Sequence, residues 1–255
     1  QTLARPKAAS LMHRLRAWTR PGSAVFMTAW HVDDPDYALI RRTWPRAGLR
    51  SFRNQEGGVR TFLARREILD LLTGDNHKAY GQDITLFGRR RGTGESIWEI
   101  KQRIGMVSSE FQVRYRKSIS GFDVILSGFF DSVGLFRLAS QAQRKQAGDW
   151  VARLQIERLA EKPFDRMSSG QQRMVLIARA VVKDPVLLIL DEPCQGLDVR
   201  NRERVLAMVA HIGSATPTNL IFTTHHADER PPCMTHELQL AKDGEWAIRR
   251  LAERD

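Results

Sequence analysis

Val186-Leu187-Leu188-Ile189-Leu190-Asp191-Glu192-Pro193 is the stretch that decides the fold of this 255-residue chain. Its apolar run, 186–190, is typical of a strand buried on both faces, as found in parallel sheets covered by helices. Two adjacent carboxylates, Asp191 and Glu192, follow the run directly. Because ligands of open α/β sheets bind at the carboxyl ends of strands, these side chains are the first candidates for a site. An acidic turn without a function is the alternative interpretation.

Helix and strand signals alternate on both sides of this stretch. The patterns predict strands at 82–87, 103–107, 186–190 and 219–224, and a closing hairpin of 237–241 with 245–249. They predict helices at 68–72, 140–159 and 171–182, and a further helix that Asp198 caps and that ends near residue 212. Such alternation indicates an α/β fold with a largely parallel central sheet.

A small, hydroxyl-rich segment opens the predicted helix 171–182. It reads Met167-Ser168-Ser169-Gly170-Gln171-Gln172-Arg173. The free N–H groups and the dipole at a helix N-terminus form an anion site, and Ser168 and Gly170 allow a phosphate to come close. An ordinary serine cap, with no ligand, is the competing interpretation.

Several motifs in one register resemble the nucleotide-binding domain of ABC-type ATPases. They are MSSGQQR, ARA, VLLILDEP, CQGLD and TTHH, and the resemblance extends from about residue 68 to the end. It implies a P-loop NTPase-like ABC cassette, with a mostly parallel central sheet and a helical signature subdomain at about 112–172. The tract 104–135 is most similar to the second cassette of tandem ModF-type proteins, which were named for molybdate transport and photorepair.

The resemblance also implies a role for each matching residue. Asp191 matches the Walker B aspartate that serves the metal, Glu192 matches the catalytic base, and His225 matches the switch histidine at the γ-phosphate. Asp198 matches the D-loop that crosses the dimer interface. The signature motif, which closes over the γ-phosphate held by a partner cassette, is matched by Ser168, Ser169, Gly170 and Gln171.

By the same resemblance, the expected function is ATP binding and hydrolysis in a head-to-tail dimer that powers a partner. The cofactors are ATP and Mg²⁺, and the partners are a second ABC cassette, as a homodimer or in tandem, and a membrane permease of a molybdate-like transporter. The alternatives are a soluble tandem-cassette ATPase without a transport role and a non-catalytic remnant. The expected location is cytoplasmic, at the inner face of the plasma membrane where a permease is present.

The chain departs from the family where the Walker A motif belongs. A P-loop needs glycines, whose backbone N–H groups cradle the phosphates, and a lysine that reaches the β- and γ-phosphates. The residues directly before the predicted helix 68–72 are VRTFLARRE (59–67), which contain neither glycine nor lysine. The Q-loop departs as well, since Glu110 or Gln112 stands near the expected glutamine. The sequence thus predicts that the chain's own nucleotide site is crippled.

The genetic code offers a reason for this departure. Codons for Val59-Arg60-Thr61 and Ala64-Arg65-Arg66 exist that, when read one base earlier, encode Gly-Pro-Asn and Gly-Lys-Thr, at the spacing of a P-loop. Residues 1–66 also carry thirteen Lys and Arg against four Asp and Glu, so they hold most of the net charge of +11. We therefore expect 1–66 to be a basic, poorly structured or out-of-frame segment, and 67–255 to be the cassette. A basic nucleic-acid-binding tail is the weaker alternative.

The remaining composition excludes several classes. No apolar run approaches the length of a membrane-spanning helix. Two cysteines, Cys194 and Cys233, cannot form a disulfide framework, and no secretory signal pattern is present, which favours a reducing cytoplasm. The first residue, Gln1, leads us to expect a fragment. A zinc site in the polar cluster near His225 is a weak alternative, because the adjacent His226 points the opposite way at a strand end, so the pair chelates poorly. That cluster also includes Asp228, Glu229, Cys233 and His236.

Overall fold

The structure, a computed structural model, describes only part of the chain. The described residues are 24–27, 46–48, 51–53, 59–61, 85–87, 89–90, 94, 96–108, 118–240 and 246–251. The chain divides into two compact units. The first comprises Gln1–Arg20, Met27–Ile100 and Glu237–Arg250, and the second comprises Pro21–Phe26, Lys101–His236 and Leu251–Asp255.

Short strands make up most of what is described in the first unit. Strands β2 (Arg46–Gly48), β3 (Ser51–Arg53) and β4 (Val59–Thr61) form an antiparallel sheet, and β5 (Thr85–Leu86) pairs with β6 (Arg89–Arg90). Strands β10 (His236–Leu240) and β11 (Trp246–Arg250) lie where the sequence predicts a hairpin, and they are neighbours in one sheet. The predicted helix 68–72 lies outside the described residues.

Parallel strands form the centre of the second unit. The strand β8 (Leu187–Asp191) lies between β7 (Ile104–Ser108) and β9 (Asn219–Thr223), and both pairings are parallel. The short strand β1 (Ala24–Met27) also begins in this unit. Leu188, Ile189 and Leu190 are fully buried, as their apolar run predicts. The predicted α/β class with a mostly parallel sheet is confirmed.

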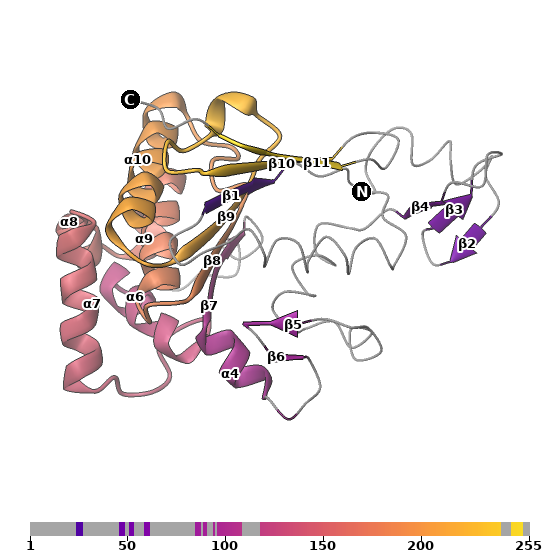
Figure 1. The fold of residues 1–255 in the computed structure, drawn as a ribbon. Coiled ribbons are helices and arrows are strands. Elements are labelled where there is room, and N and C mark those ends of the chain that lie inside the picture. Colours follow the sequence, from indigo (N-terminus) through magenta and orange to yellow (C-terminus); the bar gives the residue numbers. More distant parts are fainter. Residues whose placement is uncertain are drawn as a thin grey trace. The chain divides into compact units, whose positions relative to one another are not determined.

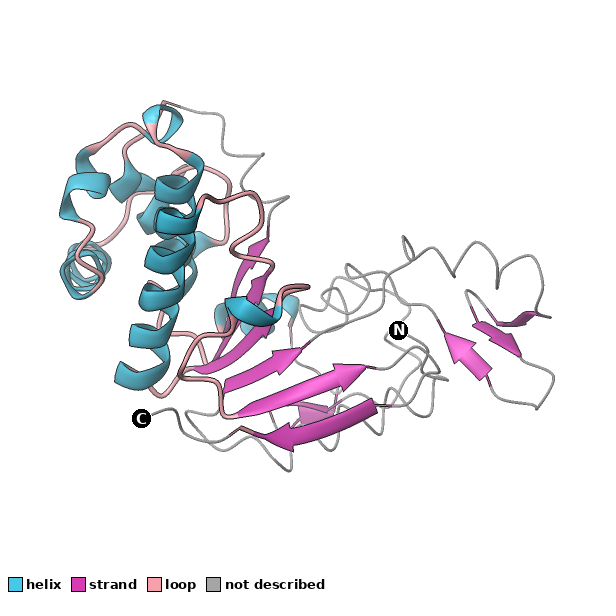
Figure 2. Ribbon diagram, turned by 90° about the horizontal axis from the view of Figure 1, so that it is seen from above, coloured by secondary structure: helices cyan, strands magenta, loops and turns pink. Residues whose placement is uncertain are grey.

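Helices cover the sheet of the second unit. The helices α9 (Ser169–Val181) and α10 (Val199–Ala215) lie on the same side of β7, β8 and β9 (Figures 1 and 2). The other helical elements are α4 (Ile97–Gln102), which begins in the first unit, α6 (Gly121–Leu126), α7 (Gln141–Arg153), α8 (Glu157–Glu161), and the 3₁₀ turns η2 (Ser127–Phe130), η3 (Phe164–Arg166) and η4 (Ala227–Glu229). One core of buried residues includes side chains from α6, α7, α8, η3, α9 and α10, among them the fully buried Val175, Phe164 and Ile125.

The single helix predicted at 140–159 is wrong, because the chain forms α7 and α8 instead. Gln155 lies between them in the left-handed region, with φ of 55°, which an α-helix does not contain. The break lets Val151 and Ile156, on either side of it, both enter the core. The burial of these side chains in a common core decides the break, and this information is absent from the local sequence pattern.

A buried ion pair joins the end of α9 to the turn after η2. The Nζ of Lys183 donates to Asp131 Oδ1 at 2.6 Å and Oδ2 at 2.8 Å, and to the Lys101 carbonyl at 2.6 Å. The side chain of Lys183 is 4% exposed. Burial lowers the pKa of Lys183, and the Asp131 carboxylate opposes this shift.

Replacing Lys183 with Met should therefore destabilise the protein by about 3 kcal/mol, because Asp131 is left without its cation in a partly buried place. The matched control is Lys145→Met, which breaks the exposed pair with Asp149, where the lysine side chain is 78% exposed. That change should alter the free energy of unfolding by about 0.5 kcal/mol or less. Urea denaturation, followed by tryptophan fluorescence, measures both. Equal losses in the two variants contradict the assignment.

Candidate functional site

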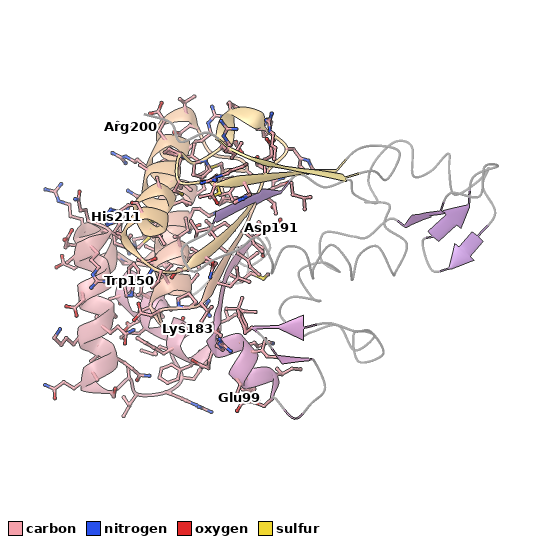
Figure 3. All side chains as sticks on the ribbon, in the orientation of Figure 1. Glu99, Trp150, Lys183, Asp191, Arg200 and His211 are labelled. Atoms are coloured by element: carbon pink, nitrogen blue, oxygen red, sulfur yellow. The ribbon has the colours of Figure 1, made fainter. Side chains whose placement is uncertain are left out.

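Two carboxylates mark the carboxyl end of β8, as the sequence predicts. Asp191 is the last residue of the strand and is 4% exposed, and Glu192, directly after it, is 5% exposed (Figure 3 labels Asp191). Glu192 has a φ of 46°, in the left-handed region that non-glycine residues seldom adopt. The strand β8 ends directly before this residue, at Asp191.

The hydroxyl of Thr223 fixes both of these residues. Thr223 pairs with Asp191 in the parallel register of β8 and β9. Its Oγ1 donates to Asp191 Oδ1 at 2.7 Å, and the amide of Glu192 donates to the Thr223 carbonyl at 3.1 Å and to Oγ1 at 3.2 Å. Sequence reasoning missed Thr223. The register of the two strands is the signal that points to it.

His225 meets Glu192 across the ends of β8 and β9. Its Nε2 lies 2.7 Å from Glu192 Oε1, and the histidine side chain is 53% exposed whereas that of the glutamate is 7% exposed. Thr224, which follows Thr223, holds the loop that carries His225. Its Oγ1 donates to Glu229 Oε2 at 2.5 Å and accepts from the His226 amide at 3.1 Å. A carboxylate and an imidazole in contact can polarise a water between them and a bound group.

The signature residues form the first turn of α9. Ser168 is the N-cap, and its Oγ accepts from the Gln171 amide at 3.3 Å. The Gln171 side chain returns a bond, because its Oε1 accepts from the Ser168 amide at 3.1 Å, and it also accepts from Lys162 Nζ at 3.0 Å. Ser168 and Ser169 are exposed, and Gly170 is buried. The serine is therefore a helix cap, as the competing interpretation held, and it also sits on an exposed helix N-terminus, where anions bind favourably.

Asp198 caps the neighbouring helix α10. Its carboxylate accepts from the Asn201 amide at 2.9 Å and from the Asn201 side-chain Nδ2 at 2.7 Å. These bonds lower the pKa of Asp198. The structure brings this residue close to the signature turn, because a Cβ placed on Gly170 would meet the Asn201 side chain at 2.4 Å.

Arg173 connects the signature helix to the end of β8. It is 2% exposed, and its Nη1 donates to the Glu192 carbonyl at 3.4 Å. Burial lowers the pKa of Arg173, and the nearby Cys194 and Asp191 oppose the shift. In the sequence, Arg173 appears only as the last letter of a motif, so its role in holding Glu192 was missed.

The cysteines are free, and both thiols titrate above their ordinary range. Burial raises the pKa of Cys194 to about 12 and that of Cys233 to about 11. A thiol with such a pKa carries almost no thiolate near neutral pH, and the thiolate is the nucleophile and metal ligand. Both residues are therefore packing residues. Within the part of the chain that the structure describes, no three His, Cys, Asp or Glu side chains gather in a way that could hold a metal ion.

The residues present fit Mg²⁺ but do not fit the phosphates of ATP. Asp191 is a buried carboxylate at a strand end and supplies the oxygen ligand that Mg²⁺ prefers. The phosphate cradle does not fit, because 59–67 contains no glycine and no lysine. Of these residues, Val59–Thr61 form β4, which pairs antiparallel with β3, and residues 62–67 lie outside the described part. The Q-loop candidates Glu110 and Gln112 also lie outside it.

Comparisons with known proteins show the family. The ABC transporter family model matches residues 67–195, a little more than half of the chain. This chain therefore belongs to the ABC transporter family, and the resemblance predicted from the sequence is confirmed. The ABC transporter ATP-binding protein ModF of Escherichia coli (strain K12) is 49% identical over 178 residues, which are 69% of this chain and 36% of ModF.

Other relatives are more distant. An uncharacterised ABC transporter ATP-binding protein of Bacillus subtilis (strain 168), YlmA, is 34% identical over 164 residues, covering 64% of this chain and 62% of YlmA. The chain thus spans less than two thirds of the length of both relatives. Among solved structures, CbiO1 from Clostridium perfringens superposes with a TM-score of 0.62 at 20% identity, covering 86% of this chain and 73% of CbiO1. That likeness shows the fold of an ABC cassette.

No helix in the described residues is both long enough and apolar enough to cross a membrane.

Proposed function

We propose that this chain is the cassette of an ATP-hydrolysing pair, in which its signature turn closes over a nucleotide that a partner cassette holds. The observation that carries the proposal is the first turn of α9, where Ser168 caps the helix, Ser169 begins it, and both residues are exposed. Support for a pair of cassettes comes from a dimeric ATP-binding cassette bound to ADP and phosphate, which shares the fold with a TM-score of 0.59 at 17% identity.

In this proposal the site residues of the chain form two sets, and each set serves a different nucleotide. The set of Ser168, Ser169, Gly170, Gln171 and Asp198 serves the partner's nucleotide and needs no P-loop in this chain. The other set, Asp191, Glu192 and His225, faces the nucleotide that the chain itself would hold. Asp191 would ligate Mg²⁺, Glu192 would orient water and His225 would stabilise the γ-phosphate. With no cradle for the phosphates in 59–67, this second site does not turn over.

We further propose that the missing cradle results from a shift of reading frame near residue 67. The family match begins at residue 67, the point at which the sequence pattern changes. Sequencing the gene tests this idea directly. The idea is wrong if the codons for 59–66 do not encode a Gly-Lys-Thr loop in the neighbouring frame.

For the wider role we propose an importer subunit that docks on a membrane permease at the inner face of the plasma membrane. Two relatives support this role: the ABC transporter ATP-binding protein ModF of E. coli, and the molybdate import ATP-binding protein MolC of Haemophilus influenzae, which is 29% identical over 175 residues. Co-purification with a permease tests the importer role.

A soluble tandem ATPase is the second candidate, because the chain matches only 36% of ModF. The missing P-loop favours a third candidate, a non-catalytic remnant.

A pair of matched serines tests the signature role. The partner is a cassette with an intact P-loop, taken from the amino-terminal half of a tandem ModF-type protein, with its own signature serine replaced by arginine so that its homodimer is inactive. Ser168→Ala should lower the ATP hydrolysis that depends on this chain about tenfold or more, because a hydroxyl that bonds to a charged phosphate is lost.

Ser140→Ala is the control, since Ser140 and Gln143 form the same capping box on α7 that Ser168 and Gln171 form on α9. Each substitution removes a cap and should destabilise its helix by about 1 kcal/mol. Only Ser168→Ala should lower hydrolysis. Equal losses in the two variants, or no hydrolysis with the unchanged chain, contradict the proposed function.

A further inference from the structure

The first turn of α10 lies between two groups of residues that the proposed function assigns to different nucleotides. On one side it contacts the signature turn of α9, at Gly170. On the other side it is tied to the loop that carries His225, through Arg202. All of these residues belong to the second unit.

Asn201 makes the contact with the signature turn. A Cβ on Gly170 would lie 2.4 Å from Asn201 Cγ, 2.6 Å from its Cβ and 2.7 Å from its Oδ1. Real Cβ atoms do not approach so closely, so Gly170 and Asn201 touch with no room for another atom. The side chain of Asn201 therefore packs directly against the first turn of α9 at Gly170.

The same side chain also holds the D-loop. Asn201 Nδ2 donates to Asp198 Oδ2 at 2.7 Å, while the Asn201 amide donates to Oδ1 at 2.9 Å. The cap alone needs only the amide bond, so the side-chain bond is an addition. Asn201 thus packs on the signature turn and bonds to the D-loop aspartate at once.

Arg202, the next residue, ties the first turn of α10 to the loop after β9. Arg202 Nη1 lies 3.3 Å from Asp228 Oδ2 and 3.7 Å from Glu229 Oε1, and the latter carboxylate accepts from Thr224. Glu229 is buried, so the tether has a fixed end. These two ion pairs connect the first turn of α10 to the loop that carries His225.

We infer that Asn201 is a positioning residue, which holds the signature turn 168–171 and the D-loop residue Asp198 at one fixed spacing so that both meet the partner cassette together. The inference rests on the proposed function, because the partner's nucleotide is the group that the spacing serves. Asn201 does not touch that nucleotide itself, and it acts through Gly170 and Asp198.

Two variants separate the two contacts of Asn201. Asn201→Asp keeps the shape that packs on Gly170, but it replaces the donor to Asp198 with a carboxylate that repels it. Asn201→Gly removes both contacts and leaves space beside Gly170. A third variant, Gly170→Ala, forces a clash that Asn201→Gly relieves, so the double variant should have the unfolding midpoint of Asn201→Gly alone.

The readouts are the thermal unfolding midpoint of the full chain and the kinetics of ATP hydrolysis with the P-loop partner described above. Asn201→Asp should lower kcat about tenfold and change KM less than about threefold, since the phosphates still bind but the transition state is poorly aligned. Gly170→Ala should lower both the midpoint and kcat. The double variant should regain the midpoint of Asn201→Gly alone, which tests the contact without any nucleotide.

The outcomes distinguish this inference from the proposed function. If the unchanged chain supports no hydrolysis with the partner, the proposed function fails, and the double-variant midpoint still tests the packing of Asn201 on Gly170. If the unchanged chain supports hydrolysis and Asn201→Asp has the same kcat and KM, the positioning role is wrong. A midpoint that is not regained in the double variant overturns the contact itself.

Discussion

Gly170→Asp is expected to lower partner-dependent ATP hydrolysis by about 10²- to 10³-fold, the loss found when a preorganised donor to a developing charge is removed. The new Cβ would enter the Asn201 side chain, with Cγ at 2.4 Å. The new carboxylate would also place a negative charge at the N-terminus of α9, where the partner's phosphate is proposed to bind. Steric and electrostatic effects therefore act in the same direction.

Gly148→Asp is the matched control for this prediction. Gly148 lies within α7, and a Cβ there meets nothing within 4 Å. The same change of size and charge should leave hydrolysis within about twofold, because a side chain at Gly148 meets no neighbour and Gly148 is not part of the signature turn. The measurement is steady-state phosphate release with the P-loop partner in excess. If both variants lose hydrolysis to a similar extent, the cause is general destabilisation of the chain, and the result contradicts the signature role.

The second large effect is in nucleotide binding by the chain alone. The lysine and the amide nest of a P-loop supply much of the binding of the phosphates, and 59–67 contains neither. We expect Mg·ATP to bind this polypeptide about 100-fold or more weakly than the protein translated from the corrected frame. A titration with a fluorescent ATP analogue measures both. Tight binding by the uncorrected chain contradicts the idea of a crippled site.

The corrected-frame protein also tests Glu192. There, Glu192→Gln should lower turnover by about 10²- to 10⁴-fold, the usual contribution of a general base, while nucleotide binding is kept. The amide preserves the size of the side chain beside His225, whose Nε2 lies 2.7 Å from Glu192 Oε1. Turnover within tenfold of the unchanged protein is the result that removes Glu192 from this role.

The parts of the fold that the sequence predicts are those with a strong local signal. The apolar run 186–190 becomes β8, offset by one residue, and the serine-opened helix becomes α9 with a capping box at Ser168. Asp198 caps α10 as predicted. In each case a single segment carries the whole pattern, because burial on both faces or a cap is readable from consecutive residues.

The residues that the sequence did not reveal act through tertiary contacts. Thr223 reaches Asp191 only because β8 and β9 pair in one register, and Arg173 reaches the Glu192 carbonyl nineteen positions along the chain. Asn201 matters because α9 and α10 pass within contact distance at Gly170. Ordinary residue types in these places carry no local signal, so their roles appear only once the strands and helices are packed.

The left-handed backbone conformation of Glu192 has a consequence for efforts to raise the thermal stability of this protein. A glutamate with φ of 46° sits in a conformation that costs about 1 kcal/mol or more, and glycine accepts it without that penalty. A library screened for heat resistance alone would therefore drift toward glycine at this position and discard the carboxylate. Directed evolution of this cassette therefore has to select for turnover and thermal stability in the same round.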